Sequence, residues 1–411
     1  MAQARPSLSA AQPNYHRRVS SLRILLTVDE STGPLAAVRA LDAAGYEVWL
    51  AASQPHTYAA RSRAAAGVLR LTDPREDPDA YAQALAARAT ELGVAAVLPG
   101  TEATLRALTG KEALFPAGIA IGTCSRETLD RATDKSLLVR FGAEAGLETL
   151  PTVELTLAEL DGRADELRFP AVVKPIASTV RTQQGALRNV EVEVVRSLRE
   201  LRAALAAGGG GVPSLVQPYV AGTLAAICGV SWEGELVCAS HQISHRIWPP
   251  GKGISSLAET VAPDRPREAG VARLLRLIGW SGVFGTQFLL AGDRAYLIDF
   301  NPRIYGSLAL AVRAGHNLPA IWADLLIGRK PGPGAYRIGV RYRAEENDFR
   351  ALAVELARGK LGALVGALPR RHTVHGVFSV RDPAPSLESL RKILSRGSLA
   401  RGMRSRQQST Y

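Results

Sequence analysis

Short apolar runs alternate with amphipathic stretches over the first third of the chain. Residues 22–28 read LRILLTV, which is typical of a buried strand, and a helical pattern follows them. A second apolar run covers residues 46–52, and a helical pattern over 78–92 precedes a third run at 94–98. Strands joined by helices with short connections form βαβ units and hence a parallel sheet. Residues 22–125 are therefore predicted to form a doubly wound α/β domain.

The pattern changes in the middle of the chain, where helices are fewer and strands are paired locally. A helix is predicted over residues 135–145, and the sequence FPAVVK at 169–174 predicts a strand. Another strand is expected over 215–219, and a helix-rich segment over 307–327. The sequence Pro-Gly-Pro-Gly at 331–334 indicates a hinge before a last, separate unit.

Two β-hairpins are predicted in this middle region. The first covers residues 229–239 around Glu233-Gly234, and the second covers 282–300 with its turn near Gly292-Asp293. With that turn, Gln287 on the incoming strand falls opposite Ile298 or Asp299 on the outgoing strand. The spacing alone leaves both registers open.

The second hairpin carries the most informative polar residues in the chain. Asp299 and Asn301 are two apart on one strand and therefore share a face. If Gln287 pairs with Asp299, three oxygen donors gather at one place, as Mg²⁺ requires. Arg303 follows directly and can bind a phosphoryl group with its planar fork of donors. A surface hairpin with incidental polar residues is the structural alternative.

Two lysines lie in positions that suit phosphate binding. Lys135 follows Asp134 at the start of a predicted helix, and Lys174 ends an apolar strand before the loop at residues 175–185. A lysine at a strand end, with a Gly/Ser/Thr-containing loop behind it, can neutralise nucleotide phosphates. Most lysines are solvated surface residues, but one that ends an apolar strand needs a partner for its charge.

The segment VQPYV at residues 216–220 is a candidate for binding a purine. The Gln217 side-chain amide can both donate and accept hydrogen bonds, and the backbone of the following residues can offer further polar groups. Those residues are Pro218, Tyr219 and Val220. A strand that ends in proline is the structural alternative.

The order of these parts resembles the ATP-grasp superfamily, most of all its carbamoyl-phosphate-synthase-like ATP-binding domain. The likeness rests on Thr-Asp-Lys (133–135), VVKP (172–175), VQPYVAG (216–222) and GTQF…LIDFNPR (285–303). Further similarity, in HRIWPP (245–250) and NPRIYGSLALAVRAGHNLP (301–319), is to bacterial carboxylate-amine ligase-like proteins.

The resemblance implies an α/β architecture in several parts. An N-terminal doubly wound α/β domain (residues 22–125) is followed by a two-lobed α+β ATP-grasp domain (126–330) and a small basic C-terminal unit (331–411). Residues 1–21 are polar, contain two prolines, and are expected to be a disordered N-terminus.

The resemblance also assigns roles and a reaction. It implies that ATP is bound by Lys135, Lys174, Gln217, Pro218, Tyr219 and Val220, and Mg²⁺ (or Mn²⁺) by Gln287, Asp299 and Asn301. Arg303, together with Lys174, would stabilise the transferring phosphoryl group. The implied activity is that of an ATP-dependent ligase, which forms an acyl phosphate from a carboxylate and transfers the acyl group to an amine or similar nucleophile. ADP and phosphate would be the products.

Three departures leave a second function open. Many relatives have glutamate where Gln287 stands, and many carry a glutamate after the glycine of the adenine segment, where this chain has Thr223. The loop at 175–185 is also less rich in glycine. The alternative is a non-catalytic ATP-binding regulatory protein with the same fold.

The acceptor site is predicted from a polar cluster between the two hairpins. His245 and Arg246 are candidates to line it, with Arg246 pairing with a substrate carboxylate or phosphate. Arg341 and Arg343 alternate on a strand after the hinge and could close the same pocket. A lone histidine is more often structural, so that reading stays open for His245.

Composition narrows the class of protein without deciding its substrate. The chain has 46% hydrophobic residues, a net charge of +12 and three cysteines without metal-ligand spacing, and no stretch suited to a membrane span. A reduced cytoplasmic location, small-molecule substrates and, as an open option, a homodimer are expected. Residues 329–411 hold 17 Lys and Arg against 6 Asp and Glu. Nucleic acid is disfavoured as a partner because this basic segment has few aromatic side chains for base stacking.

Overall fold

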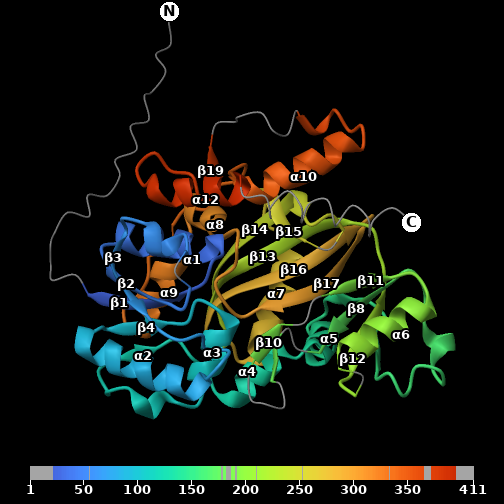
Figure 1. Cartoon of the computed structure of the whole chain (residues 1–411), viewed down its shortest axis with the longest axis horizontal. Helices are drawn as coiled ribbons and strands as arrows, with labels where there is room; N and C mark the ends of the chain where they lie inside the picture. The colour runs from blue at the N-terminus through green and yellow to red at the C-terminus, as the bar shows by residue number, and fades with distance from the viewer. Residues whose placement is uncertain are drawn as a thin grey trace, which may run out of the picture.

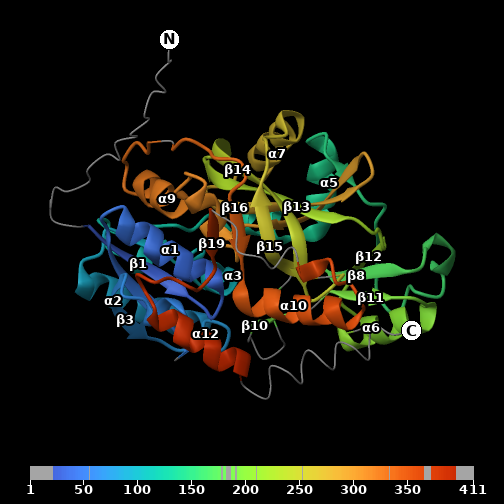
Figure 2. The same cartoon turned by 90° about the horizontal axis from the view of Figure 1, so that it is seen from above.

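The structure of the chain is a computed structural model, which describes residues 22–54, 56–176, 179–181, 187–189, 192–209, 211–251, 253–332, 334–364 and 372–394. Its elements form three groups (Figure 1). The N-terminal elements lie at one side of a long central sheet, and a smaller sheet lies at the other side; the view from above in Figure 2 shows the same order. Every helix within the described ranges is too short or too polar to cross a lipid bilayer.

The N-terminal group is a parallel sheet covered on both faces. The strand order is β3-β2-β1-β4-β5. On one face Ile24 and Leu26 pack against α1, while on the other Leu25 packs against α2, which confirms the predicted doubly wound arrangement. The elements are β1 (Arg23–Val28), α1 (Thr32–Ala43), β2 (Glu47–Ala52), β3 (Ala65–Arg70), α2 (Pro78–Leu92), β4 (Ala96–Leu98), α3 (Glu102–Leu108) and β5 (Ala120–Ile121).

A smaller antiparallel sheet, ordered β11-β8-β12-β7, forms the lobe at the other side. Side chains alternate across it: Val173 and Val216 pack beneath α6, so Lys174 and Gln217 face the opposite way. The predicted loop at 175–185 falls in part outside the described residues. The elements are β7 (Val153–Leu155), β8 (Ala171–Pro175), β9 (Thr179–Arg181), β10 (Leu187–Asn189), β11 (Glu193–Val195), α6 (Leu198–Ala207) and β12 (Ser214–Pro218).

The central sheet has the order β19-β18-β15-β14-β13-β16-β17-β6. One face packs against α4, α5 and α7, and the other shares a core with α8, α9 and the N-terminal strands. The elements are α4 (Arg126–Thr133), α5 (Lys135–Glu144), β6 (Glu148–Thr149), β13 (Thr223–Trp232), β14 (Glu235–Trp248), β15 (Ile254–Thr260), α7 (Arg265–Ile278), β16 (Gly282–Ala291), β17 (Arg294–Asn301), α8 (Leu308–Arg313), α9 (Leu318–Leu326) and β18 (Arg341–Arg343).

Both predicted hairpins form, with the turns where the sequence placed them. Trp232 pairs with Glu235 across the first turn, and Ala291 pairs with Arg294 across the second. Glu233 and Gly234 both have positive φ, as a tight two-residue hairpin turn requires. The strands β13 and β14 extend well beyond the predicted 229–239 because their outer residues are also buried in the sheet.

The C-terminal elements are built into this sheet. They are α10 (Glu345–Ala357), β19 (Thr373–His375) and α12 (Ala384–Leu394). Strand β18 pairs with β15, and β19 pairs with β18. The described part of the predicted C-terminal unit therefore shares main-chain hydrogen bonds with the central domain.

A buried ion-pair cluster fastens α10 to the central sheet. Arg246 on β14 is 8% exposed; it pairs with Asp348 and, at 2.8 Å, with Glu355. Its guanidinium also donates to the carbonyl oxygen of Ala363 at 3.1 Å, and Asp348 receives a second cation, Arg343, at 3.1 Å. Three elements thus meet at one cluster of desolvated charges.

We expect Arg246→Met to destabilise the chain strongly. The substitution removes the cation that pairs with the buried Asp348 and the half-buried Glu355. Breaking a buried ion pair in this way typically lowers the free energy of unfolding by about 3 kcal/mol or more. Arg265→Met is the matched control: Arg265 pairs with Glu268, but its side chain is 75% exposed. That control should change stability by less than about 1 kcal/mol. Urea unfolding of both variants measures the difference, and equal stabilities would contradict a structural role for Arg246.

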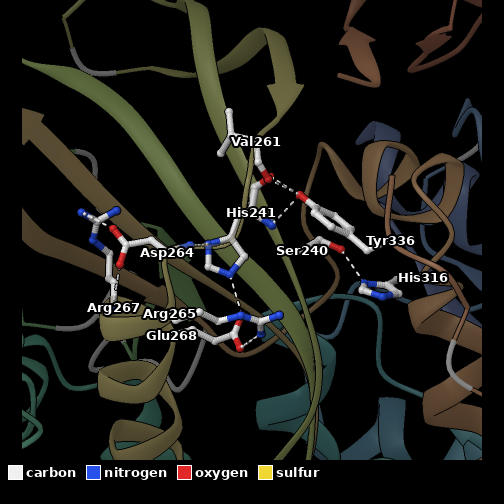
Figure 3. A network of polar contacts seen from close by, with 9 residues as sticks. All are labelled: Ser240, His241, Val261, Asp264, Arg265, Arg267, Glu268, His316 and Tyr336. Atoms are coloured by element: carbon white, nitrogen blue, oxygen red, sulfur yellow. Dashed lines mark hydrogen bonds and ion pairs between the residues drawn. The ribbon is translucent and has the colours of Figure 1, made fainter. Parts of the chain in front are cut away.

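A second buried network surrounds two histidines, His241 on β14 and His316 in the connection between α8 and α9 (Figure 3). His241 Nε2 lies 2.7 Å from Glu268, and the hydroxyl of Tyr336 donates to the carbonyl oxygen of His241 at 2.7 Å. His316 Nδ1 lies 3.0 Å from the Ser240 hydroxyl, and burial lowers the His316 pKa, so this imidazole stays neutral. Ser240 and His316 are only 3% and 7% exposed, so this pair is enclosed by the surrounding core.

Candidate active site

A β-bulge in the second hairpin sets the position of its polar residues. From the turn outward the pairs run regularly to Phe288 opposite Leu297, and the next pair is Gln287 opposite Asp299. Ile298 is the extra residue. Of the two registers that the spacing left open, the structure therefore has the one that pairs Gln287 with Asp299.

The bulge is needed because of the residues around it. Leu297 and Phe300 are three apart, so in a regular strand they would point to opposite faces. Both belong to the core beneath α7, together with Phe288. The extra residue allows this, and it turns Asp299 and Asn301 together toward the opposite face, where Gln287 also lies.

The polar residues of the hairpin form a chain of contacts. Asn301 Nδ2 donates to Asp299 Oδ2 at 3.2 Å, and Arg303 Nη2 donates to Asn301 Oδ1 at 3.2 Å. Arg303 Nη1 also donates to the carbonyl oxygen of Ile304 at 3.0 Å. These contacts hold one carboxylate, one amide and one guanidinium side by side, with Gln287 across the strand.

Lys174 lies beside this hairpin, although it comes from the other lobe. Its Nζ donates to the carbonyl oxygen of the bulged Ile298 at 3.1 Å. Burial lowers the pKa of Lys174 to about 8; Asp299 opposes that shift and Lys135 adds to it. The two lysines and Asp299 are thus near enough to interact electrostatically, as phosphate binding around a metal would require.

Lys135 is brought close by the N-terminus of α5. Asp134 caps this helix by accepting from the backbone N–H groups of Ser136 and Leu137, and the Lys135 N–H donates to the Ile176 carbonyl oxygen at 2.8 Å. A narrow cleft between the lobes is lined by Lys135, Leu138, Val139, Lys174, Leu215, Gln217, Leu297 and Ile298. The structure therefore gathers both predicted lysines and Gln217 in one cleft.

The predicted purine-binding segment consists of the end of strand β12 and the connection that follows it. Gln217 is buried on β12, where its Nε2 donates to Thr152 at 2.9 Å and its Oε1 has no hydrogen-bond partner among the described residues. Pro218 ends the strand, and Tyr219 and Val220 lie in the connection to β13. The Tyr219 N–H donates to the Pro170 carbonyl oxygen at 2.8 Å, so this backbone donor is already engaged.

A cavity of about 460 Å³ also adjoins the hairpin. Gln287, Asn301 and Arg303 form part of its wall, and the remaining wall comes from the N-terminal sheet, β13–β15 and the start of α10. The Cys228 thiol also lines it, but burial raises the pKa of Cys228 to about 12, so the thiol is not a nucleophile. The volume suits a small molecule.

Several residues of this cavity were not among the predicted site residues. Asp29 follows β1 and Thr101 and Glu102 follow β4, all at the carboxyl ends of parallel strands. Ligands of open α/β sheets bind at that edge, so this rule could have identified them from the predicted strands. Tyr305 and Asn347 carried no comparable signal, because only the tertiary fold brings them to the cavity.

The predicted acceptor-site residues lie elsewhere. Arg246 forms salt bridges with the carboxylates of Asp348 and Glu355 on α10. The exposed side chain of His245 on β14 has its Nε2 3.0 Å from Glu259 on β15. Arg341 also pairs with Glu259, at 2.9 Å. Arg343 contacts Asp348. None of the four is among the described residues that line the cavity or the cleft. Each contacts a carboxylate of β15 or α10 instead.

Comparison with known proteins identifies the fold. The family described as "ATP-grasp in the biosynthetic pathway with Ter operon" matches residues 212–347. An L-amino acid ligase from Bacillus licheniformis superposes with a TM-score of 0.57 at 18% identity, over 75% of this chain and 74% of that one. The chain has the ATP-grasp fold. No curated protein sequence matches it.

Two further ATP-grasp structures agree with this assignment. A biotin carboxylase–β,γ-ATP complex from Campylobacter jejuni has a TM-score of 0.59 at 16% identity, with 77% of this chain and 74% of that chain covered. An N5-carboxyaminoimidazole synthetase from Staphylococcus aureus has a TM-score of 0.57 at 12% identity, with 78% and 80% covered. The predicted ATP-grasp fold is thereby confirmed. The ATP-grasp match at 212–347 contains the hairpin and β18, whereas Lys135 and Lys174 precede it.

Proposed function

We propose that the chain is an ATP-dependent ligase that joins a carboxylate to an amine or similar nucleophile. The observation that carries this proposal is that the bulged hairpin contributes to the walls of two spaces. The cleft with Lys135 and Lys174 is lined by Leu297 and Ile298 of the hairpin, and the 460 Å³ cavity is lined by Gln287 and Asn301 of the same hairpin. A nucleotide in the cleft and a carboxylate in the cavity would meet at Asp299, Asn301 and Arg303.

The residues of the hairpin and of the neighbouring cleft fit magnesium and ATP. One carboxylate oxygen pair on Asp299 and the amide oxygens of Gln287 and Asn301 are the hard ligands that Mg²⁺ accepts, the rest coming from phosphates and water. No group of three or more His, Cys, Asp or Glu side chains suited to a metal occurs among the described residues, so the metal would bind mainly together with ATP. The unpaired Gln217 Oε1 can accept from an adenine amino group.

The chain's own residues can support two successive transfers. When bound, the metal would neutralise charge on the phosphates. Lys135 and Lys174 would hold the phosphates while a carboxylate oxygen attacks the γ-phosphorus and the bond to ADP breaks. Arg303 would stabilise the resulting acyl phosphate. The nucleophile then attacks the acyl carbon, inorganic phosphate leaves with the bonding electrons, and the nucleophile loses a proton.

We expect ADP and inorganic phosphate as products, because attack on the γ-phosphorus leaves the α–β bond intact. Incubation with Mg-ATP and pairs of carboxylates and amines, followed by nucleotide analysis, measures this. AMP and pyrophosphate formed with a true substrate pair would instead mean adenylation and would contradict the proposal. Tight ATP binding without turnover on any substrate pair would favour the non-catalytic regulatory alternative, to which no described contact points specifically.

A further inference from the structure

The charged side chains around the 460 Å³ cavity differ in whether they form a salt bridge. Among the described residues, the charged side chains that line it are Asp29, Arg75, Glu102 and Arg303. Arg75 is held in a bidentate pair by Asp73, at 2.8 and 2.9 Å. Arg75 is therefore already neutralised by a carboxylate outside the cavity.

The two carboxylates of the cavity differ in their partners. Glu102 pairs with Arg106 one helical turn away, at 3.0 Å. Asp29 accepts from the Ser31 backbone N–H at 2.9 Å and from its hydroxyl at 2.6 Å, which are neutral donors. Asp73, the salt-bridge partner of Arg75, and the nearby Asp29 both raise the pKa of that guanidinium, but Asp29 has no salt bridge of its own among the described residues. The N-terminal wall of the cavity thus keeps a negative charge.

The N-terminus of α1, beside Asp29, is partly engaged by backbone from another segment. The Thr32 hydroxyl donates to the Gly306 carbonyl oxygen at 2.8 Å. A Cβ at Gly33 would lie 2.5 Å from the Tyr305 carbonyl oxygen, so backbone packs directly against this turn. Residues 304–306 therefore pack against the first turn of the helix, although Ser31 and Thr32 still form part of the cavity wall.

A second polar group in the cavity wall also lacks a partner. The Tyr305 hydroxyl is buried in a residue that is 8% exposed, and it makes no hydrogen bond of normal geometry with a described residue. Its polar neighbour is the Cys228 thiol, which is a weak partner. A buried hydroxyl of this kind is costly unless a ligand or water completes its hydrogen bonding.

We propose that the cavity selects an acceptor with a protonated amine or guanidinium group, bound by Asp29. A half-buried carboxylate that has only neutral donors gains most from a cationic partner. An anionic acceptor at the same place would be repelled by Asp29. The acceptor's nucleophile would then point to the Asn301–Arg303 end, where the acyl phosphate is expected. This inference rests on the proposed ligase function and adds the charge class of its acceptor.

The test compares isosteric probes on the full chain. Binding of L-arginine and L-citrulline, and of L-lysine and L-norleucine, is measured by calorimetry with Mg²⁺ and a non-hydrolysable ATP analogue. Phosphate release from Mg-ATP is measured with the same four compounds and a panel of carboxylates. The variants are Asp29→Asn and, as matched control, Glu30→Gln, since Glu30 is the adjacent exposed carboxylate and does not line the cavity.

We expect each cationic probe to bind about tenfold or more tightly than its neutral isostere, as for a charged hydrogen bond. Asp29→Asn should remove this preference and Glu30→Gln should keep it. Equal binding of the isosteres, no binding of either cation, or a preference that survives Asp29→Asn would overturn the inference. The wild-type comparison holds even if a variant fails to fold.

The same experiment separates this inference from the ligase function. Cation-selective binding without phosphate release on any carboxylate would count against the ligase and leave the cationic site standing. Phosphate release that is equally fast with neutral acceptors would count against the cationic site and leave the ligase function standing.

Discussion

Asp299→Asn is expected to abolish ATP turnover. Asp299 is the sole carboxylate of the predicted metal set, and an amide attracts Mg²⁺ far less than a carboxylate does. The loss should be several kcal/mol of transition-state stabilisation, on the order of a thousandfold in rate. Phosphate release measured across a magnesium titration tests this. Gln287→Glu, which adds a carboxylate on the facing strand, should keep activity and reach half-maximal rate at a lower magnesium concentration.

Asp293→Asn is the matched control for this substitution. It makes the same change on the same hairpin, but at the exposed turn between β16 and β17. Its turnover should equal that of the wild type. Near-normal turnover in Asp299→Asn, or an equal loss in both variants, would mean that the face with Gln287, Asp299 and Asn301 is not the catalytic metal site.

Lys174→Ala is expected to weaken ATP binding by about tenfold or more and to remove turnover. A charge-assisted hydrogen bond to phosphate is typically worth about 1.5–3 kcal/mol, and Lys174 reaches the bulged hairpin at Ile298. The fold should persist, because the variant removes a desolvated charge instead of leaving one unpaired. Calorimetric titration with ATP, together with thermal unfolding, separates the two effects. Unchanged affinity in a folded variant would refute the assignment.

The lowered pKa of Lys174 adds a pH dependence to this prediction. The protonated amine binds phosphate, and its pKa in the ligand-free chain is about 8. ATP affinity should therefore be highest below that pH and fall as the pH rises through it. Lys174→Arg supplies a cation that does not titrate in this range. In that variant the decline above pH 8 should disappear; an identical decline in both proteins would place its origin in another group.

Much of the hairpin could be predicted from the sequence, because local patterns determine it. Gly292-Asp293 is a strong turn signal between two apolar strands, and Asp299 and Asn301 share a face through simple alternation. Lys174 was recognisable because a charge that ends an apolar strand needs a partner. Its partner could not be predicted, since the Ile298 carbonyl oxygen belongs to a strand far along the chain.

The role of Arg246 could not be predicted in the same way. In the sequence it is a cation beside a histidine and a Pro-Pro pair, which suits a substrate site equally well. Its partners Asp348 and Glu355 are about a hundred residues away, on a helix whose polar composition gave no sign of docking there. Long-range pairs of buried charges leave no periodic trace in a sequence.

From the sequence alone, local patterns predicted the α/β class, the parallel N-terminal sheet and both hairpin turns, and they supplied the candidate cations and oxygen donors. These depend on neighbours two to four residues apart, through strand and helix periodicity. The tertiary structure alone decided the register of the hairpin, because the bulge at Ile298 exists so that Leu297 and Phe300 can enter one core. The tertiary structure also decided that Asp29 faces the cavity without forming a salt bridge to a described residue. That depends on how the N-terminal sheet packs against residues 304–306, and close packing between distant segments is a property of the whole fold.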